Sequence, residues 1–273
     1  RYAVVGNPID FSKSPAIPMA FAATTGQDIE YTKVLGPPGE FGATVDAFRA
    51  AGGRGMNVTA PFKLDALEYA TERSSRAEIA GAANALKFEG DKVIAENFDG
   101  IGLVRDVVHN LAAAMKGKRV LLLGAGGAAR GAVMPFVEQQ PASLVIANRT
   151  PAKAHALAAI ARAAGAACDV KASGCDDFRE ETYDVVFNAT SASLRGELPA
   201  VPATAFRQAT LAYELAYGKG LTPFLRLAKN AGVTQLADGV GMLVEQAAEA
   251  FAWWRGIRPE TASVIRALGI PLR

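Results

Sequence analysis

Cysteine and histidine are scarce in this sequence. Its 273 residues include two cysteines, Cys168 and Cys175, and two histidines, His109 and His155. So few cysteines cannot build a disulfide framework, which fits the reducing cytoplasm, and four scattered ligands argue against a zinc site or any other bound metal. His109 lies toward the polar side of an expected helix and His155 among small residues of another, so we expect both at the surface. Any catalytic acid or base must then be another residue type.

An excess of one charge and long apolar runs are also missing. The 29 Lys and Arg residues nearly balance 27 Asp and Glu residues, so nothing predicts a nucleic-acid partner. No apolar run is long enough to cross a membrane, and we recognise no signal peptide in the sequence as given. We therefore expect a cytoplasmic protein, a monomer or homodimer, whose partner is a small molecule rather than nucleic acid or a membrane.

The sequence does contain a glycine-rich turn directly after a short apolar run. Residues 120–123 are continuously apolar, as in a strand buried on both faces, and a helix is expected over residues 128–140. Between them lie the residues of the turn, Gly124, Ala125, Gly126, Gly127 and Ala128. Such a turn brings backbone N–H groups at a helix N-terminus close to a pyrophosphate, so it predicts a Rossmann-type dinucleotide site.

The next expected strand, residues 144–148, ends without an acidic residue. NAD-binding proteins place Asp or Glu there to bind the ribose 2′-hydroxyl. This chain has Asn148, Arg149 and Thr150, with Lys153 one turn later. Because a guanidinium can bind a 2′-phosphate with two hydrogen bonds, we predict NADP rather than NAD as the cofactor. The alternative is that Arg149 is an ordinary solvated arginine.

Lys63 and Asp99 are the strongest candidates for chemistry. Pro61 suits the first position of a helix, which puts Lys63 in the first turn, where the helix dipole disfavours a cation. A partly desolvated lysine there could exchange a proton near neutral pH, although a surface lysine is an equal alternative. Asp99 precedes a helix expected over residues 101–115, where aspartate is most often an N-cap.

Other polar residues have an ordinary structural interpretation as well as a functional one. Asn84 suits a turn, and Ser12 and Ser14 suit a loop or a helix cap. Gln246 lies within an apolar stripe of a helix expected over residues 243–254, so its amide needs partners from the backbone or from a ligand.

The order of expected elements indicates two α/β domains. Residues 2–58 alternate strand, helix, strand, helix and strand, and a hairpin is expected around Glu89-Gly90-Asp91. The helix at 101–115 then leads to the glycine turn. We place a substrate-binding domain at residues 1–101 plus 239–273, and a Rossmann-type NADP-binding domain at residues 102–238.

Eight motifs of this chain occur in the order seen in shikimate dehydrogenases. Besides the glycine turn, they are Gly6-Asn7-Pro8-Ile9 with Ser12-Lys13-Ser14-Pro15, Asn57-Val58-Thr59 with Pro61-Phe62-Lys63, Gly81-Ala82-Ala83-Asn84, Asn97 with Asp99-Gly100, Asn148-Arg149-Thr150, Asn188-Ala189-Thr190-Ser191, and Asp238-Gly239 with Gly241-Met242-Leu243-Val244 and Gln246. The set spans nearly the whole chain, which therefore resembles this family. The resemblance implies two α/β domains with a cleft between them, the C-terminal helices returning to the substrate domain.

The resemblance also implies an activity and a set of site residues. The activity is the reversible NADPH-dependent reduction of 3-dehydroshikimate to shikimate, in chorismate and aromatic amino acid biosynthesis. Lys63 and Asp99 would be the catalytic pair, with the lysine exchanging the proton. Further substrate-binding residues would be Ser12, Ser14 and Tyr217 for the carboxylate and Thr59, Asn84, Asp99 and Gln246 for the hydroxyls, with Asn57 and Lys63 beside them. NADP would contact the five residues of the glycine turn and Asn148, Arg149, Thr150, Lys153, Thr190, Ser191, Gly239 and Met242.

The chain departs from the family's usual pattern in three motifs. Phe11 replaces a histidine, Ile17-Pro18-Met19 replaces Ile-His-Asn, and Phe98 replaces the threonine of Asn-Thr-Asp. Two phenylalanines beside expected substrate contacts could narrow the site or remove a hydrogen bond, which would alter specificity. Two alternatives therefore stay open: a dehydrogenase of the same family for quinate or another cyclic polyol acid, and a non-catalytic NADP-binding regulatory protein.

Overall fold

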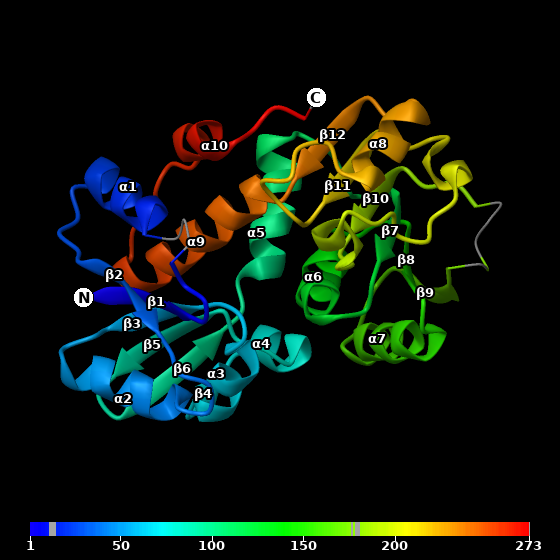
Figure 1. The fold of residues 1–273 in the computed structure, drawn as a ribbon. Coiled ribbons are helices and arrows are strands. Elements are labelled where there is room, and N and C mark those ends of the chain that lie inside the picture. Colours follow the sequence, from blue (N-terminus) through cyan, green and yellow to red (C-terminus); the bar gives the residue numbers. More distant parts are fainter. Residues whose placement is uncertain (11–14, 176, 178–180, 273) are drawn as a thin grey trace. The chain divides into compact units, whose positions relative to one another are not determined.

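The chain divides into two compact units, each built around its own sheet (Figure 1). The computed structural model describes residues 1–10, 15–175, 177 and 181–272. Unit 1 comprises Arg1–Gly102 and Val244–Ala267, and unit 2 comprises Leu103–Leu243 and Leu268–Arg273. Two helices, α5 (Asp99–Arg105) and α9 (Val240–Arg255), carry the chain from one unit to the other. Which ligand each unit binds stays a prediction.

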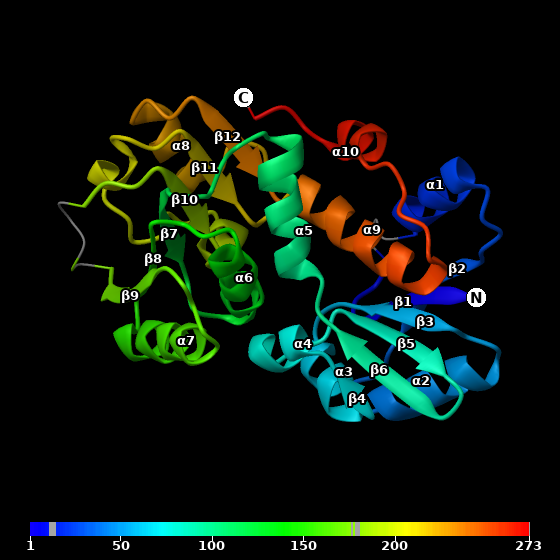
Figure 2. The ribbon, with the colours of Figure 1, turned by 180° about the vertical axis from the view of Figure 1, so that it is seen from behind.

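The sheet of unit 1 mixes parallel and antiparallel strands. Its order is β2-β1-β3-β5-β6-β4. The strands are β1 (Tyr2–Gly6), β2 (Tyr31–Leu35), β3 (Gly55–Val58), β4 (Glu72–Arg73), β5 (Ala85–Glu89) and β6 (Lys92–Glu96). β1 is parallel to both of its neighbours, whereas β5 is antiparallel to β3 and to β6. The predicted hairpin is confirmed: β5 and β6 turn at Gly90, whose φ is 59° (Figure 2).

Helices cover both faces of this sheet (Figure 1). On one face, α2 (Phe41–Ala50) and α3 (Lys63–Tyr69) pack through a core that includes Phe41, Val45 and Phe48, the apolar stripe of α2. On the other face, α9 places Trp254 in a stack on Tyr2 of β1. The remaining helices of this part of the chain are α1 (Ala16–Thr25), α4 (Ser75–Ala80) and α10 (Ala262–Leu268). Burial on both faces explains why β1 is continuously apolar.

Unit 2 has a wholly parallel sheet with the strand order β12-β11-β10-β7-β8-β9. The strands are β7 (Arg119–Leu123), β8 (Ser143–Asn148), β9 (Asp169–Gly174), β10 (Val185–Asn188), β11 (Leu211–Glu214) and β12 (Gln235–Asp238). The chain moves outward from β7 on one side, returns, and moves outward from β10 on the other, so the order reverses between β7 and β10. This is the Rossmann arrangement, in which the reversal point binds the ligand.

The helices of unit 2 also lie on both faces of its sheet (Figure 1). They are α6 (Gly127–Glu138), α7 (Pro151–Ala163) and α8 (Pro223–Asn230), with two short 3₁₀ turns, η2 (Ala192–Arg195) and η3 (Ala203–Phe206). Phe136 of α6 packs on Phe187 of β10, while Phe206 and Phe224 fill the core beneath α8.

Two predicted helices have other limits in the structure. The helix predicted over 101–115 begins at Asp99 and ends at Asn110, because its second half widens into a π-helical turn, η1 (Asp106–Asn110), and Ala112 adopts a left-handed φ of 50°. The helix predicted over 243–254 begins earlier, at Val240.

Candidate functional sites

Lys63 and Asp99 form an ion pair in unit 1. Each is the first residue of its helix, α3 and α5, and the Nζ–Oδ2 distance is 2.6 Å. The side chains are 37% and 17% exposed respectively. The prediction that Lys63 lies in a first helical turn is confirmed, but Pro61 lies before the helix, since Phe62 is the N-cap. The carboxylate offsets the unfavourable position of a cation at a helix N-terminus, and the pair stays accessible to solvent on the lysine side.

Asn84 and Gln246 extend this pair into a polar cluster of four side chains, Lys63, Asn84, Asp99 and Gln246. Asn84 is 3% exposed, and its Nδ2 donates to Asp99 Oδ1 at 2.8 Å and to Gln246 Oε1 at 3.2 Å. The Lys63 carbonyl accepts from the Ala83 N–H at 2.8 Å, which ties the start of α3 to the residue before Asn84. The structure therefore brings together four residues that were predicted from distant parts of the sequence.

Asn57 carries a buried donor with no partner among the described residues. The residue is 8% exposed, its Oδ1 accepts from the Tyr31 hydroxyl at 2.7 Å, and its Nδ2 has no hydrogen bond within the part of the chain that the structure describes. Burial raises the pKa of the Tyr31 phenol far above its usual value, so the hydroxyl stays a donor. A buried, unpaired N–H is costly unless a ligand accepts from it. Thr59 follows β3 and is half-buried.

Phe98 does not direct its side chain into the polar cluster. Its side chain is 4% exposed and packs with Ala85, Ala250 and the edge of Trp253, with ring centroids 5.6 Å apart. Only its backbone contributes to the polar cluster, because the Phe98 N–H donates to Asn84 Oδ1 at 2.9 Å. Sequence alone could not show this, since the neighbouring Asp99 points to the cluster while Phe98 points to the core.

Other residues singled out for the substrate site lie in unit 2, in α1 or outside the described residues. Ser12, Ser14 and Phe11 lie outside the described residues. Pro18 is buried in the first turn of α1, and Met19 is 45% exposed. Tyr217 belongs to unit 2, where it follows β11 with 45% of its side chain exposed.

A pocket of about 500 Å³ surrounds the glycine turn of unit 2. It is lined by Leu123–Gly127, Ala147–Thr150, Lys153, Cys175, Ala189–Ala192, Arg195 and 197–200. These include Gly124, Ala125, Gly126, Gly127, Asn148, Arg149, Thr150, Lys153, Thr190 and Ser191 of the predicted cofactor set, but not Ala128, Gly239 or Met242. The last lining segment, with Arg195 and Glu197, was not predicted, because it belongs to none of the motifs that indicated the site.

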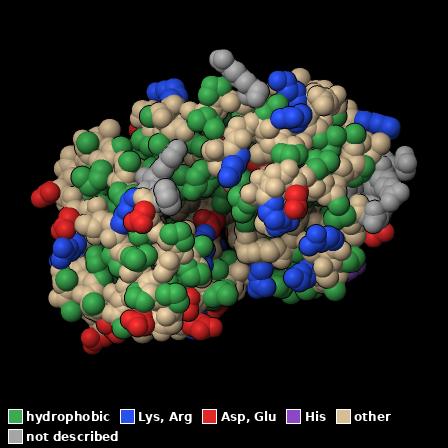
Figure 3. Space-filling view, viewed as in Figure 1, with side chains coloured by type: hydrophobic (Ala, Val, Ile, Leu, Met, Phe, Trp, Pro, Cys, Tyr) green, Lys and Arg blue, Asp and Glu red, His purple; other side chains and the backbone are tan. Residues whose placement is uncertain are grey.

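The glycine turn fits a dinucleotide diphosphate. Gly124 has a φ of 109°, and a Cβ there would lie 3.0 Å from the Ala189 carbonyl oxygen, so a side chain is excluded. At Gly126 and Gly127 a Cβ would point into open space that a diphosphate can fill. Among the described residues no side chain caps α6, which leaves its first N–H groups for a ligand. Figure 3 shows Lys and Arg side chains gathered over this unit, as a phosphorylated ligand requires.

A buried carboxylate supports the wall of this pocket. Glu214 is fully buried at the end of β11 and accepts from both Asn188 Nδ2 and the hydroxyls of Ser193 and Thr222. Burial raises the pKa of the Glu214 carboxyl, and these hydrogen bonds partly oppose the shift. Asn188 in turn accepts from the Thr190 N–H and hydroxyl at 3.1 and 2.7 Å, which links the carboxylate to a pocket-lining residue.

Gly239 and Met242 lie at the start of α9, where close packing fixes the backbone. A Cβ on Gly239 would lie 2.1 Å from the Leu215 carbonyl oxygen. The Met242 N–H donates to the Tyr213 hydroxyl at 3.2 Å, and that hydroxyl donates to buried Asp106 at 2.7 Å. The segment is thus held rigidly within unit 2.

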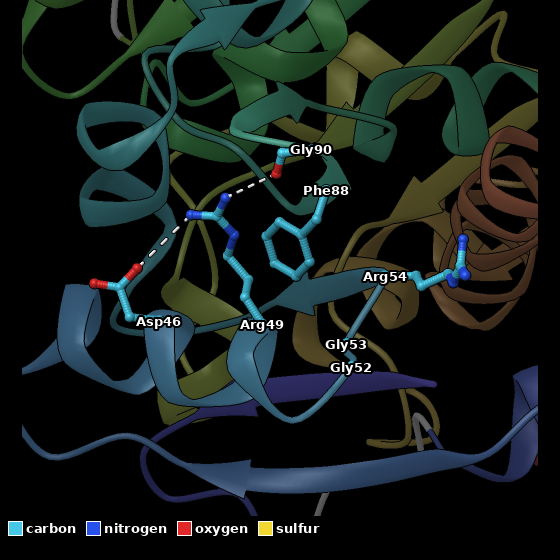
Figure 4. Close-up of a pocket in the computed structure, with 7 residues that line it drawn as sticks. All are labelled: Asp46, Arg49, Gly52, Gly53, Arg54, Phe88 and Gly90. Atoms are coloured by element: carbon cyan, nitrogen blue, oxygen red, sulfur yellow. Dashed lines mark hydrogen bonds and ion pairs between the residues drawn. The ribbon is translucent and has the colours of Figure 1, made fainter.

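A second hollow, on unit 1, contains none of the predicted site residues (Figure 4). Its central side chain, Arg49, donates to the Gly90 carbonyl at 3.1 Å, pairs with Asp46 at 3.7 Å and lies over the Phe88 ring. These contacts satisfy the guanidinium within the protein. Elsewhere in the described ranges, we find no cluster of three or more metal-ligating side chains and no helix of the length and apolarity that a membrane span needs.

Known proteins resemble this chain over nearly its whole length. Family models match three stretches: the shikimate dehydrogenase substrate binding domain at residues 4–86, shikimate / quinate 5-dehydrogenase at 106–196, and the shikimate 5′-dehydrogenase C-terminal domain at 239–268. The shikimate dehydrogenase (NADP(+)) of Nitrosospira multiformis is 53% identical over 264 residues, which is 97% of this chain and 95% of that protein.

Solved structures agree with these matches. An Ael1 enzyme from Pseudomonas putida is 56% identical with a TM-score of 0.96, covering 100% of this chain and 99% of that one. A shikimate dehydrogenase solved in complex with NADP⁺ is 31% identical with a TM-score of 0.84, covering 98% of this chain and 93% of that one.

Proposed function

Because this chain belongs to the shikimate dehydrogenase family, we propose that it catalyses the reversible NADPH-dependent reduction of 3-dehydroshikimate to shikimate, a step of chorismate and aromatic amino acid biosynthesis. The observation that carries this proposal is the Lys63–Asp99 ion pair at 2.6 Å, set beside two amide side chains. Reduction of a ring ketone that carries hydroxyls needs such a set: a proton donor for the new alcohol and polar groups for the remaining hydroxyls.

Lys63 supplies the proton and Asp99 holds the lysine. NADPH, when bound, supplies the hydride that reduces the carbonyl carbon. The Lys63 ammonium then donates a proton to the carbonyl oxygen, which becomes the hydroxyl of shikimate. Asp99 keeps the ammonium in place through the ion pair. Because the Lys63 side chain is 37% exposed, water can return the proton after each turnover. In the reverse direction, neutral Lys63 accepts the hydroxyl proton.

The substrate hydroxyls bind to the amides and the threonine near this pair. Asn57 offers its unpartnered Nδ2 donor, and Asn84 and Gln246 offer the polar atoms of the cluster. Thr59 adds a hydroxyl at the end of β3. We assign the substrate carboxylate to Ser12, Ser14 and Tyr217, which supply neutral hydroxyl donors. Apart from Tyr217, these residues lie within 1–101 plus 239–273, the range that we propose as the substrate-binding domain.

The pocket of unit 2 holds NADP in this proposal. The turn from Gly124 to Ala128 receives the diphosphate, and Arg149 with Lys153 receives the 2′-phosphate, supported by Asn148 and Thr150 beside them. Thr190, Ser191, Gly239 and Met242 complete the cofactor set. Apart from Gly239 and Met242, these residues lie within 102–238, the range that we propose as the cofactor domain. We place the reaction in the cytoplasm, whose reducing conditions keep cysteines such as Cys168 and Cys175 as free thiols.

The test is the initial rate of NADP reduction by purified protein with shikimate and with quinate, repeated with NAD. We expect shikimate with NADP to be the fastest pair. Lys63→Ala lowers kcat by about 10²–10⁴-fold with unchanged NADP affinity, while Lys92→Ala, an exposed lysine of the same unit, changes little. A preference for quinate supports the alternative dehydrogenase, and tight NADP binding without turnover of either acid supports a regulatory protein.

A further inference from the structure

One side chain of the cofactor pocket has the wrong charge for a phosphorylated ligand. Among the described lining residues Glu197 is the single acid, whereas Arg149, Lys153 and Arg195 are cationic. A carboxylate repels the phosphates of a dinucleotide, which weakens binding unless another group neutralises it. The arrangement around Glu197 therefore bears on how the pocket selects its cofactor.

The backbone fixes Glu197 beside Arg195. Arg195 ends η2, and Gly196 follows in the left-handed region with a φ of 72°, so the chain turns back on itself. The Glu197 N–H donates to the Ala192 carbonyl at 3.0 Å. In this turn Arg195 Nη2 meets Glu197 Oε2 at 2.8 Å, and Arg195 Nη1 donates to Ser191 Oγ at 3.1 Å.

Glu197 lies under the influence of two guanidinium groups. The hydrogen bond from Arg195 lowers the pKa of the Glu197 carboxyl below its usual value, and the charges of Arg195 and Arg149 lower it further. The carboxyl is therefore ionised at neutral pH. Since β8, β7 and β10 are neighbours in the sheet, the loops that carry Arg149 and Glu197 flank the glycine turn on its two sides.

The Arg195–Glu197 pair is exposed, so it is not explained by a contribution to the stability of the fold. Its side chains are 52% and 56% exposed, and exposed ion pairs contribute little to stability. For the same reason the carboxylate can change partner at small cost. Besides Arg195, the guanidinium whose charge acts on Glu197 is that of Arg149, the group to which we assign the 2′-phosphate.

We propose that Arg195 and Glu197 set the preference of this pocket for NADP over NAD. Glu197 is an internal anion that competes with the 2′-phosphate for Arg149, and Arg195 is the positioning residue that holds Glu197 aside. The inference rests on the proposed assignment of the 2′-phosphate to Arg149. It follows that the affinity for NADP depends on whether the Glu197 carboxylate pairs with Arg195 or with Arg149.

Three variants separate these roles. Glu197→Gln removes the competing anion, so the Kd for NADP falls by roughly three- to tenfold and the Kd for NAD changes less. Arg195→Gln releases Glu197 toward Arg149, so the Kd for NADP rises by about tenfold. The double variant, Arg195→Gln with Glu197→Gln, lacks both the competing carboxylate and the guanidinium that positions it. Its Kd for NADP therefore returns toward that of the unaltered protein.

The measurement is equilibrium binding of NADP, NAD, 2′,5′-ADP and 5′-AMP to the full chain without substrate. Across the variants, the Kd for 2′,5′-ADP must change as the Kd for NADP does, and the Kd for 5′-AMP must change as the Kd for NAD does. Glu138→Gln is the matched control, because Glu138 is an exposed acid at the far end of α6, about 18 Å along the helix from the glycine turn. It removes the same charge from the protein and must leave the NADP to NAD ratio unchanged.

Two results overturn the inference. If the double variant binds NADP as weakly as Arg195→Gln alone, Arg195 contacts the phosphate itself. If Glu197→Gln weakens NADP and NAD equally, Glu197 binds the part common to both cofactors. Arg149→Ala distinguishes a failure of this inference from a failure of the proposed 2′-phosphate site. An unchanged NADP to NAD ratio in that variant refutes the 2′-phosphate assignment, whereas a reduced ratio with no response to Glu197→Gln refutes the role of Glu197 alone.

Discussion

Gly102 and Gln246 meet without room for a side chain between them. A Cβ on Gly102 would lie 2.6 Å from the Gln246 backbone nitrogen and 2.8 Å from its Cβ. This contact lets α5 approach α9 closely enough for Gln246 to accept from Asn84 at 3.2 Å. The geometry of the polar cluster thus depends on a glycine that takes no part in its hydrogen bonds.

Gly102→Ala should push the two helices apart. Overpacking of this kind costs about 1–3 kcal/mol of unfolding free energy, and the loss of the Asn84–Gln246 hydrogen bond should raise the KM for shikimate more than it lowers kcat. Denaturant unfolding and steady-state kinetics measure the two effects. Gly42→Ala is the control. Gly42 lies in α2, and a Cβ there would meet the Tyr69 ring of α3 at 3.4 Å, an ordinary van der Waals distance. Equal effects of the two substitutions would contradict the role of Gly102.

Tyr31→Phe tests whether the buried phenol positions Asn57. The substitution keeps the ring but removes the donor to Asn57 Oδ1, so the amide can turn away from the substrate. A lost hydrogen bond of a buried group costs about 1–3 kcal/mol, and we expect the KM for shikimate to rise by about tenfold with a smaller change in kcat. Steady-state kinetics of both variants, Tyr31→Phe and Asn57→Ala, provides the test. Additive effects in the double variant would show that the two side chains act independently.

Phe98→Thr introduces the residue that the family usually carries. Because Phe98 fills the core beside Trp253, the smaller side chain leaves a cavity, and we expect a loss of about 3 kcal/mol of unfolding free energy. Turnover of shikimate at low temperature should change little, since the Phe98 backbone N–H still donates to Asn84. Thermal unfolding and initial rates check both statements. A large gain in kcat/KM without loss of stability would show that the ring obstructs the substrate after all.

The fold and the family could be predicted from sequence because their signals are local. The glycine turn after β7 and the missing acid after β8 each lie within a few residues, so they indicated a Rossmann-type unit and NADP; the comparisons confirm the family. β9 was missed, because its six residues Asp169–Gly174 have one buried aliphatic side chain, Val170, to mark a strand.

The supporting contacts could not be predicted, because they join residues far apart in the sequence. Nothing local marks Tyr31 as the partner of Asn57, or Gly102 as the neighbour of Gln246. Motif order identified Asp99 and Gln246 but said nothing of the direction of Phe98, which depends on where α9 packs. The sequence therefore predicts which residues have polar roles better than it predicts the contacts that hold those residues in position.

Glu214 gives unit 2 a pH-dependent stability with a definite sign. Burial raises the pKa of its carboxyl in the folded protein, so the folded state binds the proton more tightly than the unfolded chain does. Its contribution to stability is therefore fully present below the ordinary carboxyl pKa and is lost as pH rises through the raised folded value.

Glu214→Gln removes this titration and places an amide N–H among the donors of Asn188, Ser193 and Thr222, which lowers stability by a similar amount at every pH. We expect the unfolding free energy of the unaltered protein, minus that of the variant, to decrease as pH rises from about 4 to 8. Urea unfolding across this range measures the difference. For the exposed control Glu138→Gln, the corresponding difference in unfolding free energy should not change with pH. A difference that grows with pH would mean that the hydrogen bonds to Glu214 outweigh its burial, because those donors would then favour the ionised carboxylate in the folded state.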